Sequence, residues 1–143
     1  MATLKVSELS VGDWVGVRCG TKINAFKVEE IKFNNIIHKY VVLLNNKTYG
    51  LPTTELQPIP ITAEILEKNG WGNDGMYATL RIDEHRHLEY YYHEHRLRKY
   101  YCGIDEWQNH AKVNDITFAV HCYSVHQLQH ALRLAGVDKE INL

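Results

Sequence analysis

Residues 58–75 read PIPITAEILEKNGWGNDG, and this stretch separates two halves of different pattern. Its two prolines hold the isoleucine between them extended, because a residue that precedes proline avoids the helical region. Thr62 is then a candidate helix N-cap, and Gly70 is placed to end the helix. A glycine-rich loop follows. We therefore predict a linking helix and loop over residues 61–75.

The 60 residues before this stretch predict five short strands separated by turns. In the first strand Val15 and Val17 fall on one face, and Asn45-Asn46 is a tight hairpin signal. Five strands in so short a span predict a small SH3-like barrel, whose closure removes exposed strand edges. The expected strands are residues 11–17, 25–31, 36–44, 47–51 and 54–59.

Residues 76–143 predict an antiparallel sheet with a C-terminal helix, packed against the first half. Residues 76–82 alternate, with Met76, Ala78, Leu80 and Ile82 on one face. A polar turn follows at residues 83–87. Residues 88–102 are strand-forming with a break near Glu94-His95, and residues 116–122 form the last strand. Ser124 and Gln127 make a capping box for a helix whose buried stripe is Val125, Leu128, Leu132 and Ala135. The predicted fold class is α+β.

The composition excludes several classes of protein. The 143 residues have a formal net charge of -1 and are 45% hydrophobic, which argues against disorder. No apolar run is long enough to cross a membrane, and no polybasic arm suggests non-specific duplex binding. The start of the chain lacks the features of a signal peptide, so we expect the protein to stay in the cytosol where it is made. The three cysteines are far apart and form no C-x-x-C pair.

The most unusual segment is residues 85–101, which holds four of the nine histidines and five of the nine tyrosines. Arginine and lysine are interleaved with these rings. Exposed tyrosine and arginine are typical anchors of protein interfaces, so a protein partner or self-association is the first interpretation. Nucleic acid or a nucleotide is the alternative, because the rings stack on bases and the cations meet phosphates. The candidate binding residues are Tyr90, Tyr91, Tyr92, His93, His95, Arg96, Arg98, Lys99, Tyr100 and Tyr101.

A metal site is a weaker hypothesis for the same segment. A His-x-His pair on a strand places both rings on one face, and two such pairs could converge. The candidate ligands are His85, His87, His93 and His95. Such a site would make the protein a metal-dependent hydrolase. We otherwise predict no cofactor.

The remaining signals for catalysis are few. His121, Cys122 and His126 form a weak nucleophile and base candidate, although Cys122 lies in an apolar strand. The chain has no phosphate loop, nucleophile elbow or dinucleotide fingerprint. Apart from the metal hypothesis, which leaves enzyme activity open, we therefore expect a non-catalytic protein and assign no catalytic residue.

Three motifs together resemble a family of small uncharacterised proteins from Bacteroidetes phages, prophages and mobile elements. They are LSVGDWV at residues 9–15, IPITAEILEKNGW at residues 59–71, and VHQLQ at residues 125–129. The family pattern has Leu at the position of Ile61, Phe at that of Trp71 and Asn at that of His130. The resemblance implies a viral or mobile-element origin, and it supplies no activity and no functional residues. With this origin, we expect a non-catalytic binding or assembly protein of a phage or mobile element, located in the cytoplasm of the bacterial host or in the phage particle. The lack of a long apolar run separately predicts that it has no membrane partner.

Overall fold

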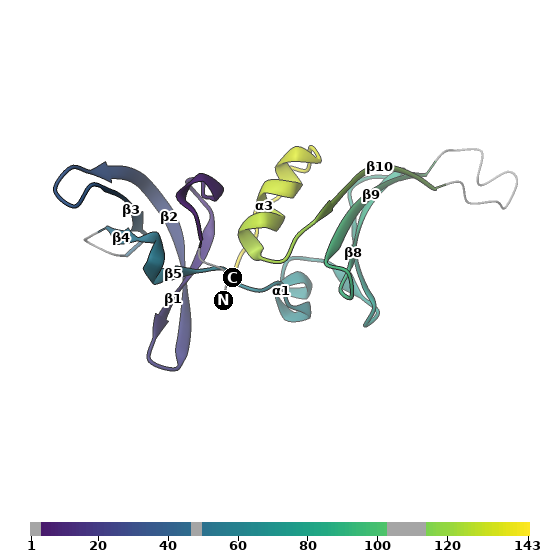
Figure 1. The fold of residues 1–143 in the computed structure, drawn as a ribbon. Helices are drawn as coiled ribbons and strands as arrows, with labels where there is room; N and C mark the ends of the chain where they lie inside the picture. The colour runs from purple at the N-terminus through teal and green to yellow at the C-terminus, as the bar shows by residue number, and fades with distance from the viewer. Residues whose placement is uncertain (1–3, 47–49, 103–113) are drawn as a thin grey trace, which may run out of the picture. The chain divides into compact units, whose positions relative to one another are not determined.

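The computed structural model describes residues 4–46, 50–102 and 114–143. This part of the chain is α+β, as predicted, with two antiparallel sheets of five strands and two α-helices (Figure 1). The chain divides into two compact units. The first comprises Met1–Pro60 and Ser124–His126, and the second comprises Ile61–Tyr123 and Gln127–Leu143. No helix in the described residues is long and apolar enough to cross a membrane.

The sheet of the first unit is a strongly curled half-barrel of order β4-β3-β2-β1-β5. Its edge strands β4 and β5 are joined by a single 3₁₀ turn, so the sheet must bend round to bring them together. A register shift between Val28 and Glu30 helps β2 to bend, as bulges do. The elements are η1 (Val6–Glu8), β1 (Trp14–Cys19), β2 (Lys22–Asn34), β3 (Lys39–Leu44), β4 (Leu51–Pro52), η2 (Thr53–Glu55) and β5 (Leu56–Gln57).

The bounds of these strands differ from the expected ones. The first strand begins at Trp14, because the residues before it form a turn. The expected strand over residues 54–59 is wrong at both ends. Its first two residues belong to η2, and Pro58, which has no N–H to donate, follows the last paired residue. The returning strand expected over residues 47–51 lies partly outside the described residues.

The second unit is a meander of order β10-β9-β8-β7-β6. Thr62 Oγ1 accepts a hydrogen bond from the N–H of Ile65 at 3.3 Å, and Gly70 has a φ of 88°, so both helix-end predictions for α1 are confirmed. The break near Glu94-His95 is also confirmed, because β8 ends at Tyr91 and β9 begins at Arg96. The elements are α1 (Ala63–Lys68), β6 (Gly72–Asn73), β7 (Tyr77–Arg81), β8 (Arg86–Tyr91), β9 (Arg96–Cys102), β10 (Asn114–His121) and α3 (Val125–Leu134).

One face of this second sheet is part of the core. Lys99 on this face donates from Nζ to the carbonyl of Ala135, which joins the end of α3 to the sheet. The predicted apolar stripe of the C-terminal helix is buried, although its last residue, Ala135, follows the end of α3. Of the predicted apolar face, Ala78 and Leu80 are buried and Ile82 is half-buried just beyond the end of β7, whereas 58% of Met76 is exposed. Asp74 Oδ1 accepts the N–H of Met76 in a turn, so this residue precedes the strand. The sheet residues buried here are Ala78, Leu80, Leu88, Tyr90 and Leu97.

Candidate functional site

The opposite face of the second sheet carries polar and aromatic side chains that are half-buried or exposed. Residues directly opposite each other in antiparallel strands point to the same side, so the register places these side chains in three rows across β7, β8 and β9. We call this surface the open face. Its rows are Tyr77–Tyr91–Arg96, Thr79–Glu89–Arg98 and Arg81–His87–Tyr100.

Two stacked ring pairs occupy the outer rows of the open face. The rings of Tyr77 and Tyr91 are 4.8 Å apart between centroids, with an interplanar angle of 23°. The rings of His87 and Tyr100 are 5.1 Å apart, with an angle of 13°. Each pair joins neighbouring strands, and cross-strand aromatic pairs of this kind stabilise a sheet. The two pairs also leave a strip of aromatic surface on each side of the middle row.

The charges on the open face are mostly positive. Arg81, Arg96 and Arg98 contribute three cations, and Glu89 is the one acidic side chain in the nine positions that define the face. Tyr100 links this acid to Arg98, because its hydroxyl donates to Glu89 Oε1 at 3.4 Å and accepts from Arg98 at 3.3 Å. The face therefore has a local positive charge, although the whole chain has a net charge of -1.

Hydrogen bonds and partial burial also affect ionisation here. Burial, with a smaller contribution from the Glu89 carboxylate, raises the pKa of Tyr77 above its usual value. The hydrogen bond to Tyr100 raises the pKa of Arg98. The tyrosine therefore stays neutral and the arginine stays charged at physiological pH.

Four of the ten predicted binding residues lie on the open face: Tyr91, Arg96, Arg98 and Tyr100. Three others, Tyr90, Lys99 and Tyr101, alternate with them and point to the opposite side. The assignment of Tyr90 to a binding surface is wrong, because this side chain is fully buried. Lys99 is instead bonded to the Ala135 carbonyl, and Tyr101 is 41% exposed beside His85.

The other three predicted binding residues lie in the turn between β8 and β9. His95 has a φ of 52°, and its carbonyl accepts the N–H of Cys122 at 2.8 Å, so it shapes the turn. The Tyr92 hydroxyl is buried and has no hydrogen-bond partner among the described residues. Tyr92 and His93 line a shallow pocket of about 530 Å³ with Gly75, Met76 and Tyr91.

The four histidines proposed as metal ligands do not converge. Each ring contacts a different tyrosine. In the part of the chain that the structure describes, no group of three or more His, Cys, Asp or Glu side chains is placed to hold a metal ion. The pairs are His85–Tyr101, His87–Tyr100, His93–Tyr91 and His95–Tyr123.

The weak nucleophile and base candidate, formed by His121, Cys122 and His126, also lacks the arrangement that catalysis needs. Burial raises the pKa of this thiol to about 12, so it stays protonated and unreactive. Its two candidate bases are engaged elsewhere. His121 Nδ1 lies 3.1 Å from the Glu94 carbonyl, and His126 Nδ1 lies 3.0 Å from Ser124 Oγ.

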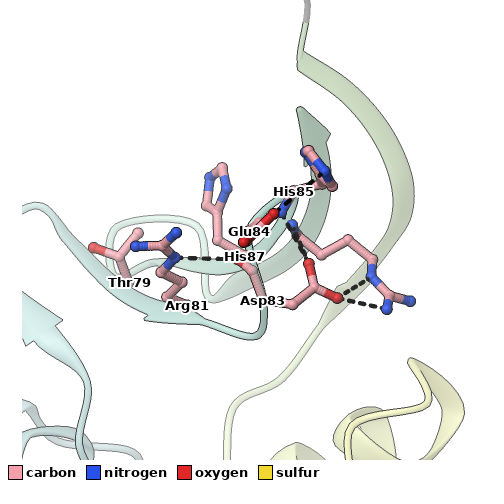
Figure 2. Close-up of a pocket in the computed structure, with 7 residues that line it drawn as sticks. Thr79, Arg81, Asp83, Glu84, His85 and His87 are labelled. Atoms are coloured by element: carbon pink, nitrogen blue, oxygen red, sulfur yellow. Dashed lines mark hydrogen bonds and ion pairs between the residues drawn. The ribbon is translucent and has the colours of Figure 1, made fainter. Parts of the chain in front are cut away.

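A pocket of about 230 Å³ lies at the turn between β7 and β8, next to the third row (Figure 2). Asp83 organises this turn. One oxygen of its carboxylate accepts the N–H groups of His85 and Arg86, and the other accepts the Arg86 guanidinium. We call the cavity of about 230 Å³ at this turn the hairpin pocket. It is lined by Thr79, Arg81, Asp83, Glu84, His85, Arg86 and His87.

Several residues of the open face were absent from the sequence prediction, namely Tyr77, Arg81 and Glu89. The signal for two of them was present. Tyr77 and Arg81 lie on the polar side of the alternating strand whose apolar side was predicted. Only the pairing of β7 with β8 brings that polar side next to the tyrosine-rich segment.

The fold and the open face define an α+β protein with a basic, aromatic sheet surface. Comparison of the chain with family models, with curated proteins and with solved structures finds no match.

Proposed function

We propose that this is a non-catalytic binding protein whose open face binds single-stranded nucleic acid. The observation that carries the proposal is the placement of two stacked ring pairs, Tyr77–Tyr91 and His87–Tyr100, on either side of a row that contains Arg98. Proteins that bind single strands combine exposed rings, on which bases stack, with cations that meet the backbone.

The spacing of the rows suits a ligand with repeated units. The outer rows are four residues apart along each strand, or about 13 Å at about 3.3 Å per residue. A single nucleotide stacked at one outer row would leave the other row empty. A strand of several nucleotides can place bases at both rows and a phosphate near the arginines of the face. This favours an oligonucleotide over a mononucleotide.

The charge balance favours a single strand over a duplex. Duplex binding without sequence preference depends on many phosphate contacts, whereas this chain has 16 basic and 17 acidic residues. The open face supplies three arginines, one of which, Arg96, also pairs with Glu94 at 3.0 Å. Stacking must therefore supply much of the affinity, and stacking requires bases that are not already paired within a duplex.

The wider setting of this function also remains a proposal. The sequence resemblance supports a phage or mobile element as its origin and the bacterial cytoplasm, or the particle, as its location. For the first unit we propose an SH3-like barrel. Its support is the five short strands and the 3₁₀ turn that joins the two edge strands of the half-barrel.

The test is binding of a fluorescently labelled single-stranded oligonucleotide to the whole chain, followed by fluorescence anisotropy. We expect Tyr91→Ala and Tyr100→Ala each to weaken binding by roughly 5- to 150-fold, since stacking is worth about 1–3 kcal/mol per base. Tyr40→Ala is the matched control, because Tyr40 is 51% exposed in the first unit. Circular dichroism verifies that each variant is folded. An oligonucleotide that does not bind, or equal affinity in all three variants, contradicts the proposal.

A second candidate function is self-association, and the hairpin between β2 and β3 favours it. Four apolar side chains are exposed there, and Ile36 is 89% exposed. Exposed apolar patches of this kind commonly mark interfaces. Light scattering over a concentration series tests this candidate, with Ile36→Ser expected to abolish any oligomer. A monomer at high concentration excludes it. The four residues are Phe33, Ile36, Ile37 and Tyr40.

A further inference from the structure

We infer that the hairpin pocket holds a backbone phosphate of the strand bound on the open face. This inference rests on the proposed function and assigns a specific role within it. The ligand class is a phosphodiester of a single-stranded nucleic acid.

The first argument is that the hairpin pocket and the open face share residues. Arg81 and His87 lie opposite each other in the register, and both belong to the third row and to the pocket lining. His87 also stacks on Tyr100. A base stacked on this ring pair therefore has its sugar and phosphate within reach of the pocket.

The second argument is that the acid deepest in the turn is already neutralised. The Asp83 carboxylate accepts two backbone N–H groups at 2.9 and 2.8 Å and forms an ion pair with Arg86. The hydrogen bond and charge of Arg86, with these N–H groups, lower the pKa of Asp83 to about 2. Asp83 and Arg86 thus form a neutral pair that shapes the pocket. The pair contributes little net charge to an incoming anion.

The third argument is the state of Arg81. Its Nε donates to the Asp83 carbonyl at 3.1 Å, which orients the guanidinium. Its two terminal nitrogens make no hydrogen bond or ion pair with the described residues, so they are available for an anion. Figure 2 shows Thr79, Arg81 and His87 together on one side of the hairpin, away from the Asp83 carboxylate. A guanidinium held in this way can bind a phosphate through two parallel hydrogen bonds.

Glu84 is the remaining acid of the hairpin pocket. Its side chain is 85% exposed, and one of its oxygens lies 4.0 Å from His85 Nε2. Water weakens the repulsion between this exposed carboxylate and a phosphate. Arg81 is exposed as well, but the turn orients its guanidinium, which can donate hydrogen bonds directly to a phosphate, whereas the Glu84 carboxylate cannot.

The experiment is a salt series of oligonucleotide affinity for the whole chain, measured by fluorescence anisotropy. Each phosphate contact in a single strand contributes about 0.7 to the slope of log K against log salt concentration. We expect Arg81→Ala to reduce that slope by about 0.7 and Arg81→Lys to retain it. Arg18→Ala, an exposed arginine of β1 in the first unit, is the control, because it removes the same charge. Its slope should equal that of the unsubstituted protein.

The outcomes separate this inference from the proposed function. If the oligonucleotide binds, Tyr100→Ala weakens binding and Arg81→Ala keeps the original slope, the phosphate assignment is wrong and the proposed function stands. If no oligonucleotide binds, the phosphate assignment and the proposed function are both wrong. An equal loss of slope in Arg81→Ala and Arg18→Ala attributes the effect to net charge and overturns the assignment. Matching urea midpoints between Arg81→Ala and Arg81→Lys exclude a folding defect as the cause.

Discussion

The Tyr90 hydroxyl donates a hydrogen bond to the carbonyl of Cys122 at 2.8 Å, across 32 positions in the sequence. This bond joins β8 to the segment that leads from β10 into α3. The same oxygen lies 3.1 Å from His95 Nδ1. Since the single hydroxyl proton is used on the carbonyl, His95 must donate from Nδ1 to the Tyr90 oxygen. A buried tyrosine thus connects a strand, a turn and the segment that follows β10.

Replacing this tyrosine should therefore destabilise the protein. Tyr90→Phe leaves the Cys122 carbonyl and His95 Nδ1 without their partner, and an unsatisfied buried polar group costs about 1–3 kcal/mol. We expect a loss of that size in the free energy of unfolding, measured by urea denaturation at pH 7. The control is Tyr40→Phe on an exposed hydroxyl, which should change it by less than about 0.5 kcal/mol. Equal stability of the two variants would show that the Tyr90 bond contributes nothing net.

The same residue gives a prediction about binding. Tyr90 lies on the core side of β8, whereas its neighbour Tyr91 lies on the open face. Folded Tyr90→Phe should bind the oligonucleotide with the affinity of the unsubstituted protein, and Tyr91→Ala should not. A loss of affinity in Tyr90→Phe, with an unchanged circular dichroism spectrum, would argue against the assignment of the two faces.

The thiols should differ in reactivity. Burial raises the pKa of Cys122 to about 12, so almost no thiolate exists at pH 8, whereas Cys19 is exposed. In the native protein at pH 8 we expect iodoacetamide to modify Cys19 and to leave Cys122 intact, as read by peptide mass spectrometry. Addition of urea to a concentration well above the unfolding midpoint should expose both. Fast native labelling of Cys122 would contradict its burial.

The Asp83–Arg86 pair should make the stability of the second unit depend on acid pH. The pKa of Asp83 is lowered from 3.8 to about 2, so the folded state favours the ionised carboxylate. The resulting stabilisation is fully present above pH 3.8 and is lost as the pH falls toward 2. We expect Asp83→Asn to lower the thermal midpoint at pH 7, and this difference to shrink between pH 4 and pH 2. A difference that is constant with pH would exclude the ionisation as its cause.

Gly16 in β1 should tolerate no side chain. A Cβ there would lie 2.6 Å from Ile23 Cγ2 in β2 and 3.3 Å from the Gln57 carbonyl oxygen in β5, so the Ile23 side chain would have to move and the contact between β1 and β5 would have to widen slightly. We expect Gly16→Ala to lower the free energy of unfolding by about 1–3 kcal/mol. Gly72→Ala is the matched control in β6, because its Cβ would meet its nearest neighbour at 3.8 Å. A Gly16→Ala variant as stable as Gly72→Ala would contradict the crowding.

Much of the local structure could be predicted because its signals are local. The cap at Thr62, the stop at Gly70 and the break near His95 each depend on a few adjacent residues, and the structure confirms all three. The buried stripe of α3 was likewise visible as a helical period. Whether the four histidines proposed as metal ligands converge could not be predicted, because spacing along the chain does not show which way each ring turns. In the fold, each of these rings contacts a different tyrosine.

The sequence by itself determined the α+β class, the α1 and α3 helices and the concentration of rings between residues 85 and 101. Tertiary structure decided which rings share a surface. A strand alternates its side chains with a period of two, so shifting the register by one residue moves every side chain to the other face. The turn at residues 92–95 and the pairing of β8 with β7 and β9 select Tyr91 for the open face and Tyr90 for the core. That choice depends on long-range pairing, which no short stretch of sequence contains.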